Sequence, residues 1–171
     1  MGLVHIYCGD GKGKTSSAVG LSIRALGSGM SVGFCQFFKN GSSGEIKILK
    51  KLERCTYIQP EKSFPLFMNM TDSQKVDAQK YYTEYFNSAL LHAKENDVLV
   101  FDEIISTCNF GMLDIDYVVK SIEAIKNDCE IILTGRDPDT KLIQLADYIC
   151  EIKNVRHPFD TGIIARKGIE Y

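Results

Sequence analysis

The sequence has 171 residues, a length that is usual for one domain with a substantial buried core. Its formal net charge of -2 gives no broad basic surface, which argues against nucleic-acid binding. No apolar run is long enough to span a membrane, and the six cysteines form no C-x-x-C pair, so we expect a cytoplasmic protein with reduced thiols.

An apolar strand over residues 3–7 leads into a glycine-rich loop that ends in Gly-Lys-Thr, the pattern of a phosphate-binding P-loop. In such a loop, backbone N–H groups surround phosphate oxygens, the lysine adds a positive charge, and the threonine hydroxyl reaches Mg²⁺. A helix predicted over residues 15–26 directs its positive end at the same anion. The residues expected to bind a nucleoside triphosphate are Gly9, Asp10, Gly11, Lys12, Gly13, Lys14 and Thr15.

Strands and helices alternate along the rest of the chain, as the hydrophobic periodicity indicates. The predicted strands cover residues 31–38, 55–59, 97–101, 130–134 and 148–152. The predicted helices cover residues 45–52, 71–94, 114–126 and 139–146, with a short helical segment after residue 103. Thr71, with Gln74 three places on, is the pattern of a capping box at the start of the helix over residues 71–94. This alternation indicates an α/β protein with a P-loop NTPase (RecA-like) fold, in which a mostly parallel central sheet carries helices on both faces. No linker interrupts the pattern, so we expect a single domain over residues 1–171.

Polar residues that suit a ligand site follow two of the predicted strands. Asp102 and Glu103 come after the apolar strand over residues 97–101, and the ends of parallel strands form the ligand crevice of an α/β sheet. A carboxylate at this place holds Mg²⁺ in P-loop proteins. The alternative is an acidic pair that only stabilises the start of a helix. Arg136 follows the strand over residues 130–134, where it is either a phosphate ligand or a surface arginine.

Aromatic residues occur in two different settings. Those at helical spacing within residues 71–94 are most simply core residues, and they are Tyr81, Tyr82, Tyr85 and Phe86. Phe64 and Phe67 instead lie in an irregular stretch that contains a proline. Two interpretations of this pair remain open, because such residues either cover a large flat ligand or pack beneath the loop as a satellite of the core.

Together these motifs resemble the P-loop ATP:corrinoid adenosyltransferases, the family that makes adenosylcobalamin. The loop G-D-G-K-G-K-T is similar to the family form G-N-G-K-G-K-T, including the missing first glycine. Other stretches that resemble the family are C-Q-F-F-K at residues 35–39, F-D-E at 101–103, T-G-R at 134–136, V-R-H-P-F-D-T-G at 155–162 and R-K-G-I-E-Y at 166–171. The family usually carries two tryptophans, and this chain departs from it in having none. Leu66 or Phe67 is the candidate to replace the one that lies near Phe64.

The resemblance implies that the 5′-deoxyadenosyl group of ATP is transferred to the reduced cobalt of a corrinoid, with release of triphosphate. Such a reaction serves adenosylcobalamin synthesis or salvage. Lys14 and Arg136 are then the expected catalytic residues. Thr15 and Glu103 would hold Mg²⁺. Phe64 and Phe67 would contact the corrinoid, a reductant such as a flavoprotein would supply the electron, and a homodimer is the expected assembly.

Two other functions are compatible with the motifs. A P-loop kinase acting on a nucleoside or another small molecule would share the loop and the acidic strand end, although no arginine-rich lid is visible in the sequence. A non-catalytic module could instead bind nucleotide and corrinoid without reaction. Neither alternative involves a membrane or a nucleic acid.

Overall fold

The computed structural model describes residues 2–65 and 67–169, so Leu66 and the last two residues of the tail motif, Glu170 and Tyr171, lie outside the described residues. The strands are β1 (Val4–Cys8), β2 (Val32–Gln36), β3 (Cys55–Ile58), β4 (Val98–Asp102), β5 (Glu130–Thr134) and β6 (Tyr148–Glu151). The helices are α1 (Lys14–Gly27), α2 (Gly44–Leu49), α3 (Asp72–Leu90), α4 (Ile104–Asn109), α5 (Ile115–Ile125) and α6 (Thr140–Leu145). Short 3-10 turns lie at Phe67–Asn69, Leu91–Lys94 and Pro158–Thr161.

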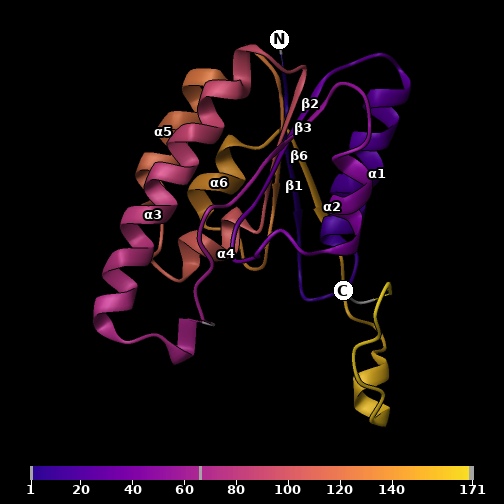
Figure 1. The fold of residues 1–171 in the computed structure, drawn as a ribbon, viewed down its shortest axis with the longest axis vertical. Coiled ribbons are helices and arrows are strands. Elements are labelled where there is room, and N and C mark those ends of the chain that lie inside the picture. The colour runs from indigo at the N-terminus through magenta and orange to yellow at the C-terminus, as the bar shows by residue number, and fades with distance from the viewer. Residues whose placement is uncertain (1, 66, 170–171) are drawn as a thin grey trace.

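The six strands form one sheet in the order β3-β2-β4-β5-β1-β6, and every pairing among the described residues is parallel. Helices α1 and α2 lie on one side of this sheet, whereas α3, α5 and α6 lie on the other (Figure 1). The predicted α/β class, with a parallel sheet covered on both faces, is confirmed. β5 separates β1 from β4, so groups at the carboxyl ends of β1 and β4 face each other across a single strand.

Two apolar clusters hold these layers together. One joins α1 and α2 to the sheet, through residues such as Ala18, Phe34 and Ile46. The other joins the opposite face to α3, α5 and α6, through residues such as Phe86 and Ile122. All five residues of β2 and of β4 are buried, which is expected of strands that are covered on both faces.

Most predicted boundaries lie within a few residues of the observed ones, and the differences have local causes. The predicted capping box is present, since Thr71 and Gln74 exchange hydrogen bonds at the start of α3. α3 nevertheless ends at Leu90 and continues as a 3-10 turn. β2 ends at Gln36 rather than at residue 38, because Phe38 takes a left-handed φ of 54° that an extended strand does not allow. Within the described ranges, none of the helices is long and apolar enough to cross a lipid bilayer.

Gly135, directly after β5, has a φ of 151° and lies against the start of α4. A Cβ atom there would lie 2.6 Å from the Cβ of Ile105 and 2.8 Å from the backbone nitrogen of Ser106. We therefore expect Gly135→Ala to lower the free energy of unfolding by about 1–3 kcal/mol, because helix and strand would have to separate. Urea denaturation measures this, with Gly20→Ala as the control, since a Cβ at Gly20 meets nothing within 4 Å. An unchanged unfolding midpoint would contradict the expectation.

Candidate active site

The predicted phosphate loop connects β1 to α1 at the carboxyl edge of the sheet, the lower edge in Figure 1. Gly9 and Gly13 have φ values of 107° and 125°, in a region of backbone conformation that residues other than glycine rarely adopt. Gly13 is the N-cap of α1 and supplies no side-chain hydrogen bond to the first turn. Because glycine has no side chain, Gly13 does not cap the N–H groups of that turn. An anion site at a helix N-terminus requires N–H groups that are left available in this way.

Lys14 lies across this loop. Its Nζ donates hydrogen bonds to the carbonyl oxygens of Gly9 and Gly11, both at 2.9 Å. The residue is only 8% exposed, and this burial lowers the pKa of its ammonium, while the charge of Glu103 acts in the opposite direction. A positive charge is thus held inside the curve of the loop, where an anion would meet it together with the backbone N–H groups.

The segment after β6 supports the loop from the side. Gly11 N–H donates to the carbonyl of Ile152 at 2.8 Å, and Asn154 N–H donates to the Asp10 carboxylate at 3.0 Å. The latter bond lowers the pKa of Asp10. Asp10 is therefore directed toward the β6 side of the loop. A Cβ on Gly9 would lie 2.4 Å from the Ile152 carbonyl oxygen, which is a second reason for glycine at that position.

Asp102, the last residue of β4, is the centre of a hydrogen-bond network and is 0% exposed. Its Oδ1 accepts hydrogen bonds from Thr15 Oγ1 at 2.9 Å and from Thr134 Oγ1 at 2.7 Å. Its Oδ2 accepts hydrogen bonds from Gln36 Nε2 at 3.1 Å and from Lys39 Nζ at 2.8 Å. The fold thus joins the ends of β2, β4 and β5 to the first turn of α1 through one carboxylate.

Glu103 is positioned differently from its neighbour. It adopts a left-handed φ of 64° as the N-cap of α4, and its N–H donates to Thr134 Oγ1 at 2.9 Å. Its Oε2 accepts a hydrogen bond from Ser106 Oγ at 2.7 Å. The structure therefore brings Asp102, rather than Glu103, into direct contact with Thr15, although Glu103 is near enough to affect Lys14 electrostatically.

The other predicted polar residues lie at the rim of the same edge. Lys12 and Arg136 are both exposed. The positive charge of Arg136 lowers the pKa of Asp10 and of Lys14, which places the guanidinium within electrostatic range of the loop. The sequence motifs indicated no role for Lys39, although it belongs to the stretch 35–39 that carries part of the resemblance. The sequence signal that could have indicated Lys39 as a site residue is its position just beyond a strand that ends at this edge of the sheet.

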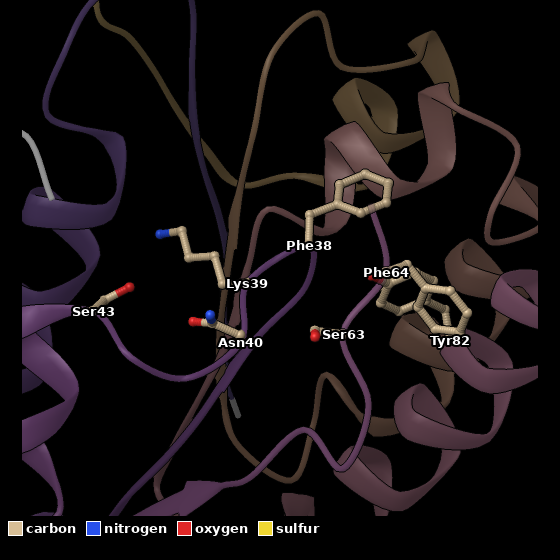
Figure 2. Close-up of a pocket in the computed structure, with 7 residues that line it drawn as sticks. All are labelled: Phe38, Lys39, Asn40, Ser43, Ser63, Phe64 and Tyr82. Carbon is tan, nitrogen blue, oxygen red and sulfur yellow. The ribbon is translucent and has the colours of Figure 1, made fainter. Parts of the chain in front are cut away.

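A hollow with an aromatic wall adjoins this network (Figure 2). Its lining residues are Phe38, Lys39, Asn40, Ser43, Ser63, Phe64 and Tyr82. The Phe64 ring packs against Tyr81 and Tyr82, with centroids 5.6 and 5.7 Å apart. Both open interpretations of Phe64 thus have support, because it packs on the core and also lines the hollow.

Phe67, in contrast, stacks on Phe110 at a centroid distance of 5.0 Å and packs against the core without lining this hollow. The aromatic helix residues Tyr81, Tyr82, Tyr85 and Phe86 are buried, as predicted for core residues. Burial also raises the pKa of Tyr82 to about 12, so its hydroxyl stays neutral at physiological pH.

A second hollow lies beside α1 and reaches the C-terminal tail. Its lining residues are Thr15, Ser16, Val19, Gly20, Lys39, Ser43, Gly44, Glu45, Gly168 and Ile169. Lys39 and Ser43 line both hollows, so the two adjoin at these residues. The carboxyl edge therefore offers a cationic loop, a buried carboxylate and two neighbouring spaces for ligands.

Comparison with known proteins identifies the kind of protein that carries this site. The family described as ATP:corrinoid adenosyltransferase BtuR/CobO/CobP matches residues 1–171. The chain belongs to this family. The resemblance drawn from the motifs is thereby confirmed, and the chain is a transferase of the corrinoid adenosyltransferase type.

Curated corrinoid adenosyltransferases are similar to this chain over nearly its whole length. The Pseudomonas aeruginosa corrinoid adenosyltransferase is 33% identical, over 99% of this chain and 84% of its own length. Corrinoid adenosyltransferase CobA of Salmonella typhimurium is 28% identical, over 99% of this chain and 86% of its own. A corrinoid adenosyltransferase of a Sinorhizobium species is 27% identical, over 99% and 80%. Membership of this family favours adenosyl transfer over the kinase alternative.

Proposed function

We propose that this corrinoid adenosyltransferase takes the 5′-deoxyadenosyl group from ATP and releases the three phosphates as one triphosphate ion. The observation that carries the proposal is the Lys14 ammonium inside the glycine loop, beside the contact between Thr15 and Asp102. That arrangement suits the binding of a whole polyphosphate chain, and the two adjoining hollows leave space for the nucleoside and the corrinoid. One domain, residues 1–171, would carry the function.

The proposed reaction makes modest chemical demands on the protein. The electron pair of the reduced cobalt attacks C5′ of ATP, the cobalt–carbon bond forms, and the bond between C5′ and the triphosphate oxygen breaks with its electrons leaving on the triphosphate. No proton is transferred, so no general base is needed. The side chains must hold two large substrates in line and stabilise negative charge on the leaving group.

The residues at the carboxyl edge suit these tasks. The N–H groups of the loop over residues 9–15, other than that of Gly11, which donates to Ile152, would bind the phosphates together with Lys12 and Lys14. Arg136 at the rim would add charge during catalysis. Mg²⁺ prefers oxygen ligands, and the Thr15 hydroxyl next to a buried carboxylate is a donor set that fits it. We propose that Thr15 holds Mg²⁺ with Asp102, directly or through water, and that Glu103 contributes from α4. The ion would supply charge neutralisation for the triphosphate.

The aromatic hollow is the proposed place for the corrinoid, with Phe64 as a contact. We expect Phe64→Ala to raise the KM for the corrinoid about tenfold and to leave ATP binding unchanged, because one aromatic contact is lost. Steady-state kinetics with each substrate varied separates the two effects. Met68→Ala is a matched control in the same loop, since Met68 is 90% exposed. An effect of Phe64→Ala on the KM for ATP alone would contradict this assignment.

The location, the assembly and the electron donor of the enzyme are proposed from the family membership and the composition. We propose a cytoplasmic homodimer that receives its electron from a reductant such as a flavoprotein. The product would serve adenosylcobalamin synthesis or salvage. Sedimentation of the purified protein at several concentrations measures the assembly.

One anaerobic assay tests the proposed function. Protein, Mg²⁺-ATP and chemically reduced cobalamin are mixed, and the products are separated. The proposal expects a light-labile cobalt–carbon product and an equal amount of inorganic triphosphate. ADP would instead indicate the kinase, and binding of both ligands without product would indicate the non-catalytic module. Either outcome would refute the proposed reaction.

A further inference from the structure

Lys39 occupies a position that the proposed function does not require. Its Nζ lies 2.8 Å from Asp102 Oδ2 and 3.2 Å from Thr15 Oγ1. Thr15 and Asp102 are the groups proposed above to hold Mg²⁺. The Lys39 ammonium thus stands beside both proposed metal ligands.

The backbone after β2 directs Lys39 to this place. Phe37 N–H donates to the carbonyl of Asp102 at 2.9 Å, which keeps the chain beside β4 after the strand has ended. Phe38 then takes its left-handed φ of 54°, which is uncommon for a bulky residue. As a result, the Phe38 ring and the Lys39 side chain point in different directions (Figure 2). The Phe38 ring packs edge-on against Tyr82.

Electrostatics explain why a positively charged group lies beside Asp102. A fully buried carboxylate such as Asp102 is costly unless a positive charge compensates it. Lys39 supplies that charge through its ion pair with Asp102, whereas the Lys14 ammonium donates to the loop carbonyls instead. A divalent cation held by Thr15 and Asp102 would stand close to the Lys39 ammonium, which contacts both residues, and like charges at short range repel.

We infer that Lys39 is a positioning residue that acts as an exchangeable counter-ion of Asp102. Its ammonium neutralises the carboxylate before nucleotide binds, and the metal that accompanies the nucleotide displaces it. Lys39 lines the aromatic hollow as well as the hollow beside α1, so its displacement moves a positive charge along the wall that the two hollows share. Binding of metal and nucleotide on one side thereby changes the charge on the wall of the aromatic hollow on the other.

The inference rests on the proposed metal site, but its test requires neither ATP nor a corrinoid. Binding of Mn²⁺, a paramagnetic substitute for Mg²⁺, is measured by electron paramagnetic resonance of the free ion in the absence of nucleotide. We expect Lys39→Met to bind Mn²⁺ at least about tenfold more tightly than the wild type, because its competitor is gone. Lys39→Arg keeps the charge and should resemble the wild type. Adding Asp102→Asn to Lys39→Met should abolish the gain.

Equal or weaker Mn²⁺ binding by Lys39→Met would overturn the inference. Lys141→Met is the matched control, because Lys141 pairs with Asp116 at an exposed place and should leave Mn²⁺ binding unchanged. The Mn²⁺ measurement detects no reaction product. Its outcome is therefore independent of whether the proposed adenosyl transfer takes place.

A second measurement uses the wild-type protein, in case Lys39→Met folds poorly. The ammonium nitrogen of Lys39 is observed by ¹⁵N NMR and assigned by its loss in Lys39→Arg. We expect its signal to shift when Mg²⁺ and the β,γ-imido analogue of ATP are added together. The analogue with a chelator should leave the signal near its original position. A signal that does not respond to Mg²⁺ with the analogue would overturn the inference.

Discussion

Replacing Lys14 with alanine is expected to lower the rate of adenosyl transfer by on the order of 10²- to 10³-fold, the loss typical when one preorganised charge at a leaving group is removed. The effect should be large because the ammonium is held inside the loop by the carbonyls of Gly9 and Gly11 and is almost buried. A charge that is desolvated and already in place stabilises a leaving triphosphate without reorganisation. The rate is measured under single-turnover conditions with saturating reduced corrinoid.

Folding should survive this change, which makes the result interpretable. The two loop carbonyls lose one donor and regain water, so we expect the free energy of unfolding to fall by only about 1 kcal/mol. Lys141→Ala is the matched control, because it removes an exposed lysine that pairs with Asp116 and should leave the rate unchanged. A Lys14→Ala rate within tenfold of the wild type would show that the loop lysine does not act on the leaving group.

The strand–loop–helix unit at the N-terminus could be predicted from sequence because its signals are local. An apolar strand, closely spaced glycines and Lys14-Thr15 determine their own conformation within a few residues. The capping box that begins α3 is equally local, and it too was predicted correctly. The alternation of such units then indicated the parallel sheet.

The order of the strands is a different matter, because it depends on contacts between distant residues. Thr15, Asp102 and Thr134 meet because β5 pairs with both β1 and β4, and no local pattern specifies those pairings. The same distance explains why Lys39 was overlooked. Its partner Asp102 is 63 positions away in the sequence.

The different directions of the two adjacent carboxylates also became clear only from the structure. Asp102 is the last residue of β4 and points into the network, whereas the left-handed turn at Glu103 directs that side chain to Ser106. Successive residues at a strand end point in different directions, so a shift of one residue in the predicted end of β4 exchanges the two carboxylates. The predicted strand stopped at residue 101, one residue too early.

Asp102→Asn is the change that decides which of these carboxylates serves the metal. We expect activity to fall by at least about 100-fold at physiological Mg²⁺, with partial recovery at high Mg²⁺, because the amide no longer offers a charged ligand. The rate is measured across a range of Mg²⁺ concentrations. Glu103→Gln, measured in parallel, should have the smaller effect, since its carboxylate is bonded to Ser106 and not to Thr15.

The same substitution should also destabilise the fold. Asp102 Oδ1 accepts hydrogen bonds from two hydroxyls, and its Oδ2 accepts from an amide and an ammonium. An asparagine must turn its NH₂ either toward the two hydroxyls or toward the amide and the ammonium. The hydroxyls of Thr15 and Thr134 can rotate to accept from that NH₂, so the arrangement survives, but the charge opposite Lys39 is lost. We expect the free energy of unfolding to fall by about 2–3 kcal/mol, measured by urea denaturation, since Lys39 is partly exposed and can turn to water.

Asp116→Asn supplies the control for both measurements, because it breaks an exposed ion pair and should cost less than about 0.5 kcal/mol. Retained activity in Asp102→Asn together with a large loss in Glu103→Gln would reassign the metal to Glu103. In that case the buried carboxylate would serve only to hold the strand ends, the loop and Lys39 together. Because the stability effect of Asp102→Asn does not depend on metal, the two measurements separate a structural role from a catalytic one.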